Sequence, residues 1–192
     1  MSSDKSFWNE AAKYGLMLGV VMGASKIFEQ SLVINGALEY AGWMLLEWFL
    51  FATLFFAILY RATKRRADSM DPALGYSFGQ GVNYMMLLSI LAAIPVSCLY
   101  YVYINSIVGY DNYIEGLISV MVAAAESRPI DATSANMVEL LIDQVRSQPQ
   151  VSIFSTLFST VIQYAFAGLL AGLILAGFIS RKPEIFEKKD EQ

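Results

Sequence analysis

Four long apolar segments constrain the fold of this chain more than any other feature of its sequence. They cover approximately residues 12–33, 37–60, 78–103 and 153–179. A helix needs about 20 mostly apolar residues to cross the hydrocarbon core of a bilayer, and each segment is long enough. Only 16% of the 192 residues are charged, whereas soluble domains average about 25%. The sequence therefore predicts an all-α integral membrane protein, with four transmembrane helices in a single membrane domain over residues 1–192.

The connections between the segments and the basic residues predict how the helices are oriented. The turn dipeptide Asn35-Gly36 is so short that the first two segments must form an antiparallel helical hairpin, and the last two form a second one. Most of the 13 basic residues lie in the N-terminal flank, the 61–77 connection and the 181–192 tail. Because loops rich in Lys and Arg stay in the cytoplasm, we expect both termini and the 61–77 loop there. No small-residue cleavage site closes the first segment, so we expect it to be kept as a membrane anchor.

Residues 105–152, between the third and fourth segments, carry two further candidate helices separated by Arg128-Pro129. In the first, Ile114, Ile118 and Met121 belong to an apolar stripe at helical spacing. The polar faces of both helices are mostly acidic, whereas helices that lie on a lipid surface usually carry a Lys-rich face. We therefore expect an extracytoplasmic helical hairpin that packs against the bundle or against a partner.

Two rows of small residues recur at every fourth position of the first and fourth segments. They are Gly15, Gly19 and Gly23 in the first segment, and Gly168, Gly172 and Ala176 in the fourth. Helices in lipid gain little from hydrophobic association, so small residues matter by allowing two backbones to approach closely. The rows predict helix packing, either within one chain or between two copies.

Four charged residues lie inside the first hairpin: Lys26, Glu29, Glu39 and Glu47. Lys26 and Glu47 are nearly the same number of positions from the Asn35-Gly36 turn, so their depths differ by only a few ångströms, at about 1.5 Å per residue. An unpaired charge at that depth would cost several kcal/mol. The pattern predicts a Lys26–Glu47 ion pair that fixes the hairpin, while Glu29 and Glu39 reach the interface.

The functional alternative for these charges is an ion, proton or substrate site that opens to the outer face. If they form a structural pair, Lys26→Met should destabilise the detergent-solubilised protein, and adding Glu47→Gln should restore part of the loss. Elsewhere in the spans, Gln163 is better explained by an interhelical hydrogen bond than by ligand binding.

The stretch Gly-Tyr-Ser-Phe-Gly-Gln-Gly at residues 75–81 resembles a phosphate-binding loop in its glycines only. It lacks the preceding strand and the following Lys-Ser/Thr that such a loop requires. The spacing of Ser77 and Gln80 instead fits an S-x-x-Q capping box, in which each side chain bonds the backbone N–H of the other. We therefore expect these two residues to cap the third membrane helix.

The residue inventory excludes many enzyme mechanisms. The chain has no histidine, which removes the commonest general base and metal ligand. Its single cysteine, Cys98, allows no intrachain disulfide, and we expect it to be a small packing residue. No metal-ligand motif is present, and the net charge of −4 leaves no basic stripe for nucleic acid. We therefore expect no catalytic residues, no metal, no cofactor and no nucleic-acid partner.

The order of these features resembles the bacterial "domain of unknown function 4199" family of four-span inner-membrane proteins. The residues that carry the resemblance are Phe7-Trp8, the run from Ala12 to Gly15, the basic inner loop and, above all, the motif at residues 75–81. The resemblance covers nearly the whole chain, implies a multi-pass location in the bacterial inner membrane, and implies no active-site residues. It implies at most a link to polyprenol-phosphate glycan metabolism.

The sequence favours a non-enzymatic accessory or scaffold protein within a membrane complex. Its predicted partners are membrane lipids and either another membrane protein or further copies of itself. The first alternative is a small transporter or lipid-handling protein that uses the intramembrane charges Lys26, Glu29 and Glu47. A membrane enzyme acting on lipid-linked substrates is the third hypothesis, although the sequence shows no general base or metal site for it.

Overall fold

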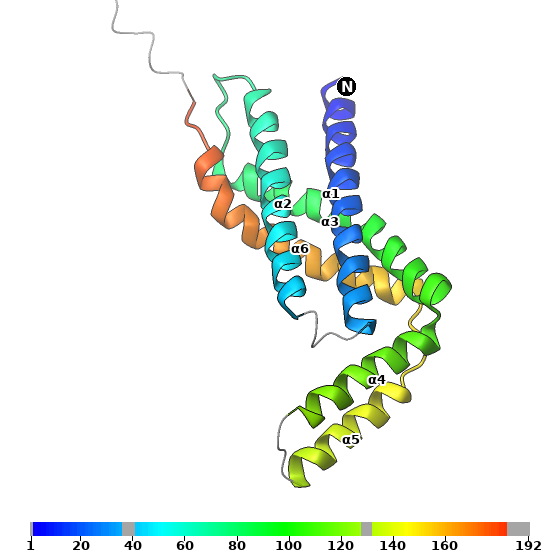
Figure 1. Cartoon of the computed structure of the whole chain (residues 1–192). Helices are drawn as coiled ribbons and strands as arrows, with labels where there is room; N and C mark the ends of the chain where they lie inside the picture. The colour runs from blue at the N-terminus through cyan, green and yellow to red at the C-terminus, as the bar shows by residue number, and fades with distance from the viewer. Residues whose placement is uncertain (1, 36–40, 128–131, 184–192) are drawn as a thin grey trace, which may run out of the picture.

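The computed structural model describes residues 2–35, 41–127 and 132–183. Within these ranges the chain is helical, with four helices long and apolar enough to cross a membrane. The prediction of an all-helical protein with four membrane-length helices is therefore confirmed (Figure 1). The elements are α1 (Ser2–Ile34), α2 (Ala41–Asp68), α3 (Phe78–Val102), the π-helix η1 (Tyr103–Val108), α4 (Tyr110–Glu126), α5 (Ala132–Arg146) and α6 (Ile153–Ile179).

Several helix boundaries differ from the predicted spans. Helix α1 begins at Ser2, well before residue 12, and α2 continues to Asp68, so residues 61–68 of the predicted basic loop are helical. This extension follows from the sequence, because Arg, Ala and Lys favour helix and no proline occurs before Pro72. The predicted start of the second span, at residue 37, lies outside the described residues. Cys98, expected to be a small packing residue, is exposed.

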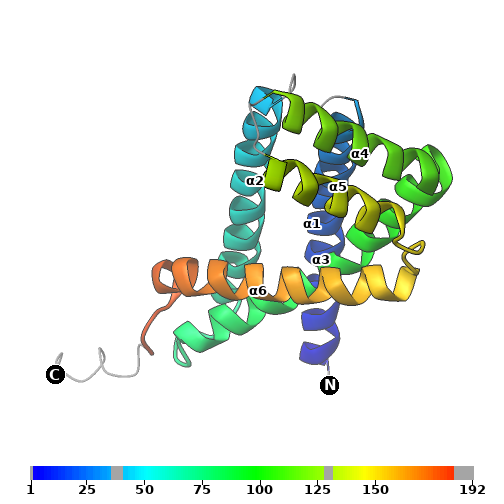
Figure 2. The ribbon, with the colours of Figure 1, turned by 90° about the horizontal axis from the view of Figure 1, so that it is seen from below.

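Helix α3 forms the centre of the bundle. It packs most extensively against α6 and next most against α1, whereas α2 touches α1, α3 and α6 less closely. The contacts of the glycines show that α1 runs parallel to α3 and that α6 runs antiparallel to it. Helices α4 and α5 lie side by side and extend from one end of the bundle (Figures 1 and 2). We call this the hairpin end and the opposite end, which carries Arg66 and Arg181, the basic end.

The small residues of α1 and α6 lie where these helices meet α3. A Cβ atom on Gly15 would lie 2.6 Å from Cβ of Leu91, and one on Gly168 would lie 2.5 Å from Oγ of Ser89. The same crowding occurs at Gly19, Gly23 and Gly172, and Ala176 is buried against Gly81. These residues therefore serve helix contacts within one chain, because each allows a neighbouring helix to approach closer than a side chain would permit.

The motif at residues 75–81 joins three parts of the chain at the basic end. Ser77 and Gln80 form the capping box of α3: the N–H of Ser77 donates to Oε1 of Gln80 at 2.8 Å, and the N–H of Gln80 donates to Oγ of Ser77 at 3.3 Å. Gly75 has a φ of +67° and lies against the backbone of Arg181 and Pro183, which leaves no room for a Cβ. Glycine is the residue that adopts this backbone conformation readily.

Tyr76 continues the same connection by a short antiparallel bridge to Arg181. The backbone N–H of each residue donates to the carbonyl of the other, at 3.0 and 2.9 Å. The guanidinium of Arg181 then donates to the carbonyls of Ala67 and Met70, at 2.9 and 2.7 Å, where α2 ends. Burial raises the pKa of the Tyr76 hydroxyl to about 12, so this residue stays neutral. The end of α2, the start of α3 and the end of α6 are thereby held together.

Candidate functional site

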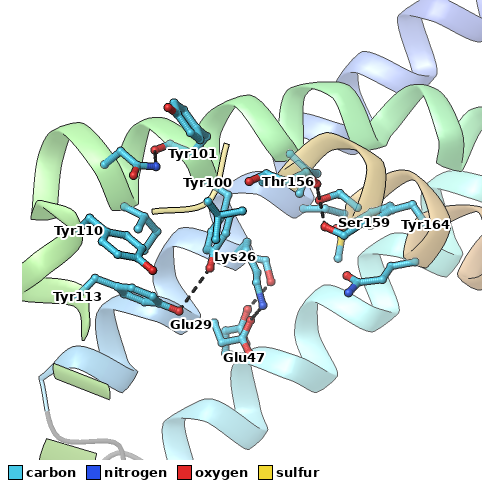
Figure 3. Close-up of a pocket in the computed structure, with 18 of the residues that line it drawn as sticks. Lys26, Glu29, Glu47, Tyr100, Tyr101, Tyr110, Tyr113, Thr156, Ser159 and Tyr164 are labelled. Carbon is cyan, nitrogen blue, oxygen red and sulfur yellow. Dashed lines mark hydrogen bonds and ion pairs between the residues drawn. The ribbon is translucent and has the colours of Figure 1, made fainter. Parts of the chain in front are cut away.

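A cavity of about 500 Å³ lies toward the hairpin end, between α1, α2, α3, η1, α4 and α6. Its lining is unusually polar for a membrane-embedded position, because it contains three charged side chains together with hydroxyl and amide groups. In Figure 3 the side chains of Lys26, Glu29, Glu47, Tyr100 and Tyr113 point toward a common space. The polar lining residues are Ser25, Lys26, Glu29, Glu47, Tyr100, Tyr101, Asn105, Tyr110, Tyr113, Thr156, Ser159, Thr160, Gln163 and Tyr164.

The ion pair of Lys26 differs from the one that the sequence predicts. Its Nζ lies 2.8 Å from Oε2 of Glu29, one turn further along α1, and not in a pair with Glu47. Residues three positions apart lie on the same face of a helix, so Glu29 reaches Lys26 without any tertiary contact. Both side chains are partly exposed, at 40% and 35%.

Glu47 on α2 instead accepts a hydrogen bond from the hydroxyl of Ser25 on α1. Ser25 is closer than Lys26 to the position that lies level with Glu47 across the Asn35-Gly36 turn, so the predicted depth agrees. Lys26 is rotated away by one residue, about 100° around the helix. Glu47 is only 6% exposed.

The cavity thus brings together three of the four charged residues singled out from the sequence. Lys26, Glu29 and Glu47 all line it, and they lie near one another in Figure 3. Glu39, the fourth, lies outside the described residues. The cation, Lys26, is already paired with the carboxylate of Glu29. The second carboxylate, that of Glu47, has a neutral hydroxyl as its hydrogen-bond donor.

Tyrosines form the wall of the cavity on the α3 and α4 side. The hydroxyls of Tyr100 and Tyr113 share a hydrogen bond at 3.4 Å, and Nζ of Lys26 lies 6.0 Å from the centroid of the Tyr100 ring. Burial, followed by the hydrogen bond to Tyr100, raises the pKa of the Tyr113 hydroxyl well above its ordinary value. Tyr110 donates to the carbonyl of Pro149 at 3.1 Å, which holds the connection into α6 beside the cavity.

The π-helix η1 turns the chain from α3 toward α4 at the edge of the cavity. Nδ2 of Asn105 donates to the carbonyl of Tyr101 at 2.9 Å, and its Oδ1 accepts from Nε2 of Gln150 at 2.6 Å. Gly109 ends the element with a φ of +86°. Short π-helices are frequent at functional sites. The sequence pattern does not reveal η1, since its apolar residues simply continue the third predicted span.

Helix α6 contributes a row of hydroxyls that the sequence analysis also missed. Thr156, Ser159 and Thr160 lie on one face because they are three and four residues apart. The hydroxyls of Ser159 and Thr160 donate to the carbonyl of Thr156, at 3.0 and 2.7 Å, and that of Thr156 donates to the carbonyl of Ser152 at 3.1 Å. With their protons used in this way, the oxygens can only accept hydrogen bonds from a group in the cavity.

An apolar groove of about 370 Å³ adjoins the polar cavity between α1, α2 and α6. It is lined by Phe51, Ala52, Phe55, Phe56, Ala167 and Leu170. Five residues border both spaces: Met22, Ser25, Trp48, Gln163 and Tyr164. The two spaces are therefore adjacent, and the groove exists because α2 packs loosely against its neighbours.

Comparison with known proteins places the chain in a family. The family model described as "Protein of unknown function (DUF4199)" matches residues 13–181, which is most of the chain. Neither a curated protein nor a solved structure matches it. Within the part of the chain that the structure describes, no three His, Cys, Asp or Glu side chains lie close enough together to hold a metal ion. The resemblance seen in the sequence is confirmed, and the chain belongs to the DUF4199 family.

Proposed function

We propose that this protein binds a membrane lipid, with the polar headgroup in the cavity and an apolar chain in the groove. The observation that carries the proposal is that a polar cavity and an apolar groove adjoin each other and share five lining residues. A lipid has the same division into a polar end and an apolar end. This is the lipid-handling alternative of the sequence analysis, with α6, η1 and α4 added to the charges of α1 and α2.

The size and polarity of the cavity support this function. Small-molecule sites typically measure about 300–1,000 Å³, and a volume of about 500 Å³ accommodates a headgroup. Charged side chains within a membrane span are costly and usually serve a pathway or a ligand. Lys26, Glu29 and Glu47 lie within two membrane-length helices. Helix packing alone does not require this concentration of charge.

The predicted topology adds the side of the membrane to the proposal. With the basic end in the cytoplasm, the cavity lies in the outer half of a bacterial inner membrane and takes its lipid from the outer leaflet. Binding and presenting a lipid requires no catalytic group, so we propose a non-enzymatic role.

Blocking the groove tests the proposed function. Ala52→Trp places an indole in the groove, whereas Ala57→Trp, on the exposed side of the same helix, is the matched control. Native mass spectrometry of the gently purified proteins counts lipid molecules per chain. We expect Ala52→Trp to reduce bound lipid by about tenfold, equivalent to roughly 1.4 kcal/mol. A wild-type chain without lipid, or equal binding by the two variants, contradicts the proposal.

A second candidate function, an accessory or scaffold protein, is supported by the exposed face of α5. Leu140 and Met137 are 70% and 61% exposed on a helix outside the four membrane-length segments. Covering this apolar surface with a partner removes it from water, which is favourable. We expect Leu140→Asp to abolish a stoichiometric complex with another membrane protein or a second copy, while bound lipid stays unchanged. This function is contradicted if a mass measurement of the purified wild-type protein finds only single chains without a partner protein or a second copy.

A further inference from the structure

We propose that the headgroup bound in the cavity carries an ammonium group, held by the carboxylate of Glu47. This inference rests on the proposed function, since it names the chemical class of the lipid. Glu47 is 6% exposed and lies within a membrane-length helix. Its hydrogen-bond donor among the lining residues is the neutral hydroxyl of Ser25.

The balance of charge in the cavity leads to a cationic ligand. The lining contains two carboxylates, Glu29 and Glu47, and one cation, Lys26. Lys26 is already bonded to Glu29 at 2.8 Å. A buried carboxylate is stable only when a positive charge or several donors compensate for the water it has lost. A ligand ammonium beside Glu47 supplies the positive charge that the lining lacks.

The neutral groups of the cavity also favour a ligand that donates hydrogen bonds. Thr156, Ser159 and Thr160 give their protons to carbonyls of the chain and present acceptor lone pairs. An ammonium group has donors and no acceptor. The aromatic rings of Tyr100 and Trp48 border the same space, and the face of an aromatic ring attracts an organic cation.

The remaining donors of Lys26 account for the phosphate of such a headgroup. A lysine ammonium has three N–H donors, of which Glu29 uses one in the structure. The cavity therefore offers a positive group for a phosphate and a negative group for an ammonium. This combination matches a zwitterionic phospholipid, of which phosphatidylethanolamine is the test compound, and it disfavours phosphatidylglycerol, whose headgroup ends in hydroxyls.

Competition between the two lipids tests the inference. The purified full-length protein is equilibrated with mixed micelles that contain equal amounts of phosphatidylethanolamine and phosphatidylglycerol with identical acyl chains. Native mass spectrometry then gives the ratio of the two adducts. We expect the wild-type protein to prefer phosphatidylethanolamine by about tenfold, and Glu47→Gln to remove that preference, because a buried charge pair contributes at least this much. Glu115→Gln, an exposed carboxylate on α4, is the matched control.

The outcomes distinguish failure of the ammonium inference from failure of the proposed function. Equal adducts of both lipids on the wild-type protein overturn the ammonium inference and leave lipid binding in place, whereas the absence of any adduct overturns both. Preference for phosphatidylethanolamine that survives in Glu47→Gln also overturns the role of Glu47. Competition by free ethanolamine or sodium at equal concentration shows that the ligand is a soluble cation, which contradicts the lipid source. The wild-type ratio needs no variant, so poor folding of Glu47→Gln leaves the inference testable.

Discussion

The hydroxyl of Ser25 on α1 donates a hydrogen bond to the carboxylate of Glu47 on α2. These two helices pack loosely against each other compared with the contacts that α3 makes with α6 and α1. A polar contact at the edge of the cavity therefore supports the position of α2 where apolar packing contributes little. Its loss would affect both the stability of the bundle and the shape of the cavity.

We predict that Ser25→Ala destabilises the protein by about 1–3 kcal/mol, because the buried carboxylate of Glu47 loses its donor. Thermal unfolding in detergent measures the change, and Ser119→Ala on an exposed position of α4 should stay within about 0.5 kcal/mol of the wild type. The double variant Ser25→Ala with Glu47→Gln should be more stable than the sum of the single changes implies. Additive effects of the two substitutions would show that the hydrogen bond has no energetic role.

Lys26→Met should destabilise the protein by less than about 1 kcal/mol, since its ion pair with Glu29 is partly exposed and such pairs contribute little. The Lys26–Glu47 pair predicted from sequence implies that Glu47→Gln restores part of the loss. The structure instead predicts that Glu29→Gln does so, because Glu29 is the residue left without its partner. Double-variant unfolding curves decide between the two, and coupling of Lys26 to Glu47 alone would contradict the observed pair.

The misassigned ion pair shows what an antiparallel hairpin reveals from sequence. The position of the turn fixes depth, at about 1.5 Å for each residue, and it correctly brings this part of α1 level with Glu47. It does not fix rotation, which depends on how α1 packs against α3 through Gly15, Gly19 and Gly23. One residue of rotation exchanges Lys26 for Ser25, so the depth of these residues was predictable from sequence and their contacts were not.

Gly168→Ala should destabilise the protein by about 1–3 kcal/mol, the usual range for overpacking. Its new Cβ would lie 2.5 Å from Oγ of Ser89 and 3.0 Å from the carbonyl oxygen of Met85, so α3 and α6 must separate. Gly177→Ala on the same helix is the control, because nothing lies within 4 Å of its Cβ. That change should leave stability equal or raise it by up to about 1 kcal/mol through helix propensity. Similar melting temperatures for the two variants would contradict the observed packing.

Local and non-local features of this fold differ in how readily sequence reveals them. The capping box of Ser77 and Gln80 is local, because four consecutive residues make both hydrogen bonds. The contacts of Arg181 with Ala67 and Met70 join residues more than a hundred positions apart. From its place in the sequence, Arg181 was accordingly predictable only as part of the basic tail. The shared role of the α6 hydroxyls was not predictable from sequence for the same reason, since their common cavity exists only after α2 and α4 are in place.

Arg181→Lys should destabilise the protein by about 1–3 kcal/mol even though the charge is kept. The planar guanidinium reaches the carbonyls of Ala67 and Met70 with one nitrogen, at 2.9 and 2.7 Å. A lysine ammonium lacks this fixed geometry, so the carbonyl of Met70 loses its donor, whereas that of Ala67 keeps only the backbone N–H of Met70 at 3.2 Å. Lys182→Arg, at an exposed position, keeps the same total charge and should leave the melting temperature unchanged.

Amide hydrogen exchange localises the effect of Arg181→Lys. The N–H of Tyr76, which donates to the carbonyl of Arg181, should exchange faster in Arg181→Lys only. Equal exchange at Tyr76 in both variants would mean that the guanidinium does not stabilise the basic end, and that the backbone bridge alone holds α6 to the start of α3.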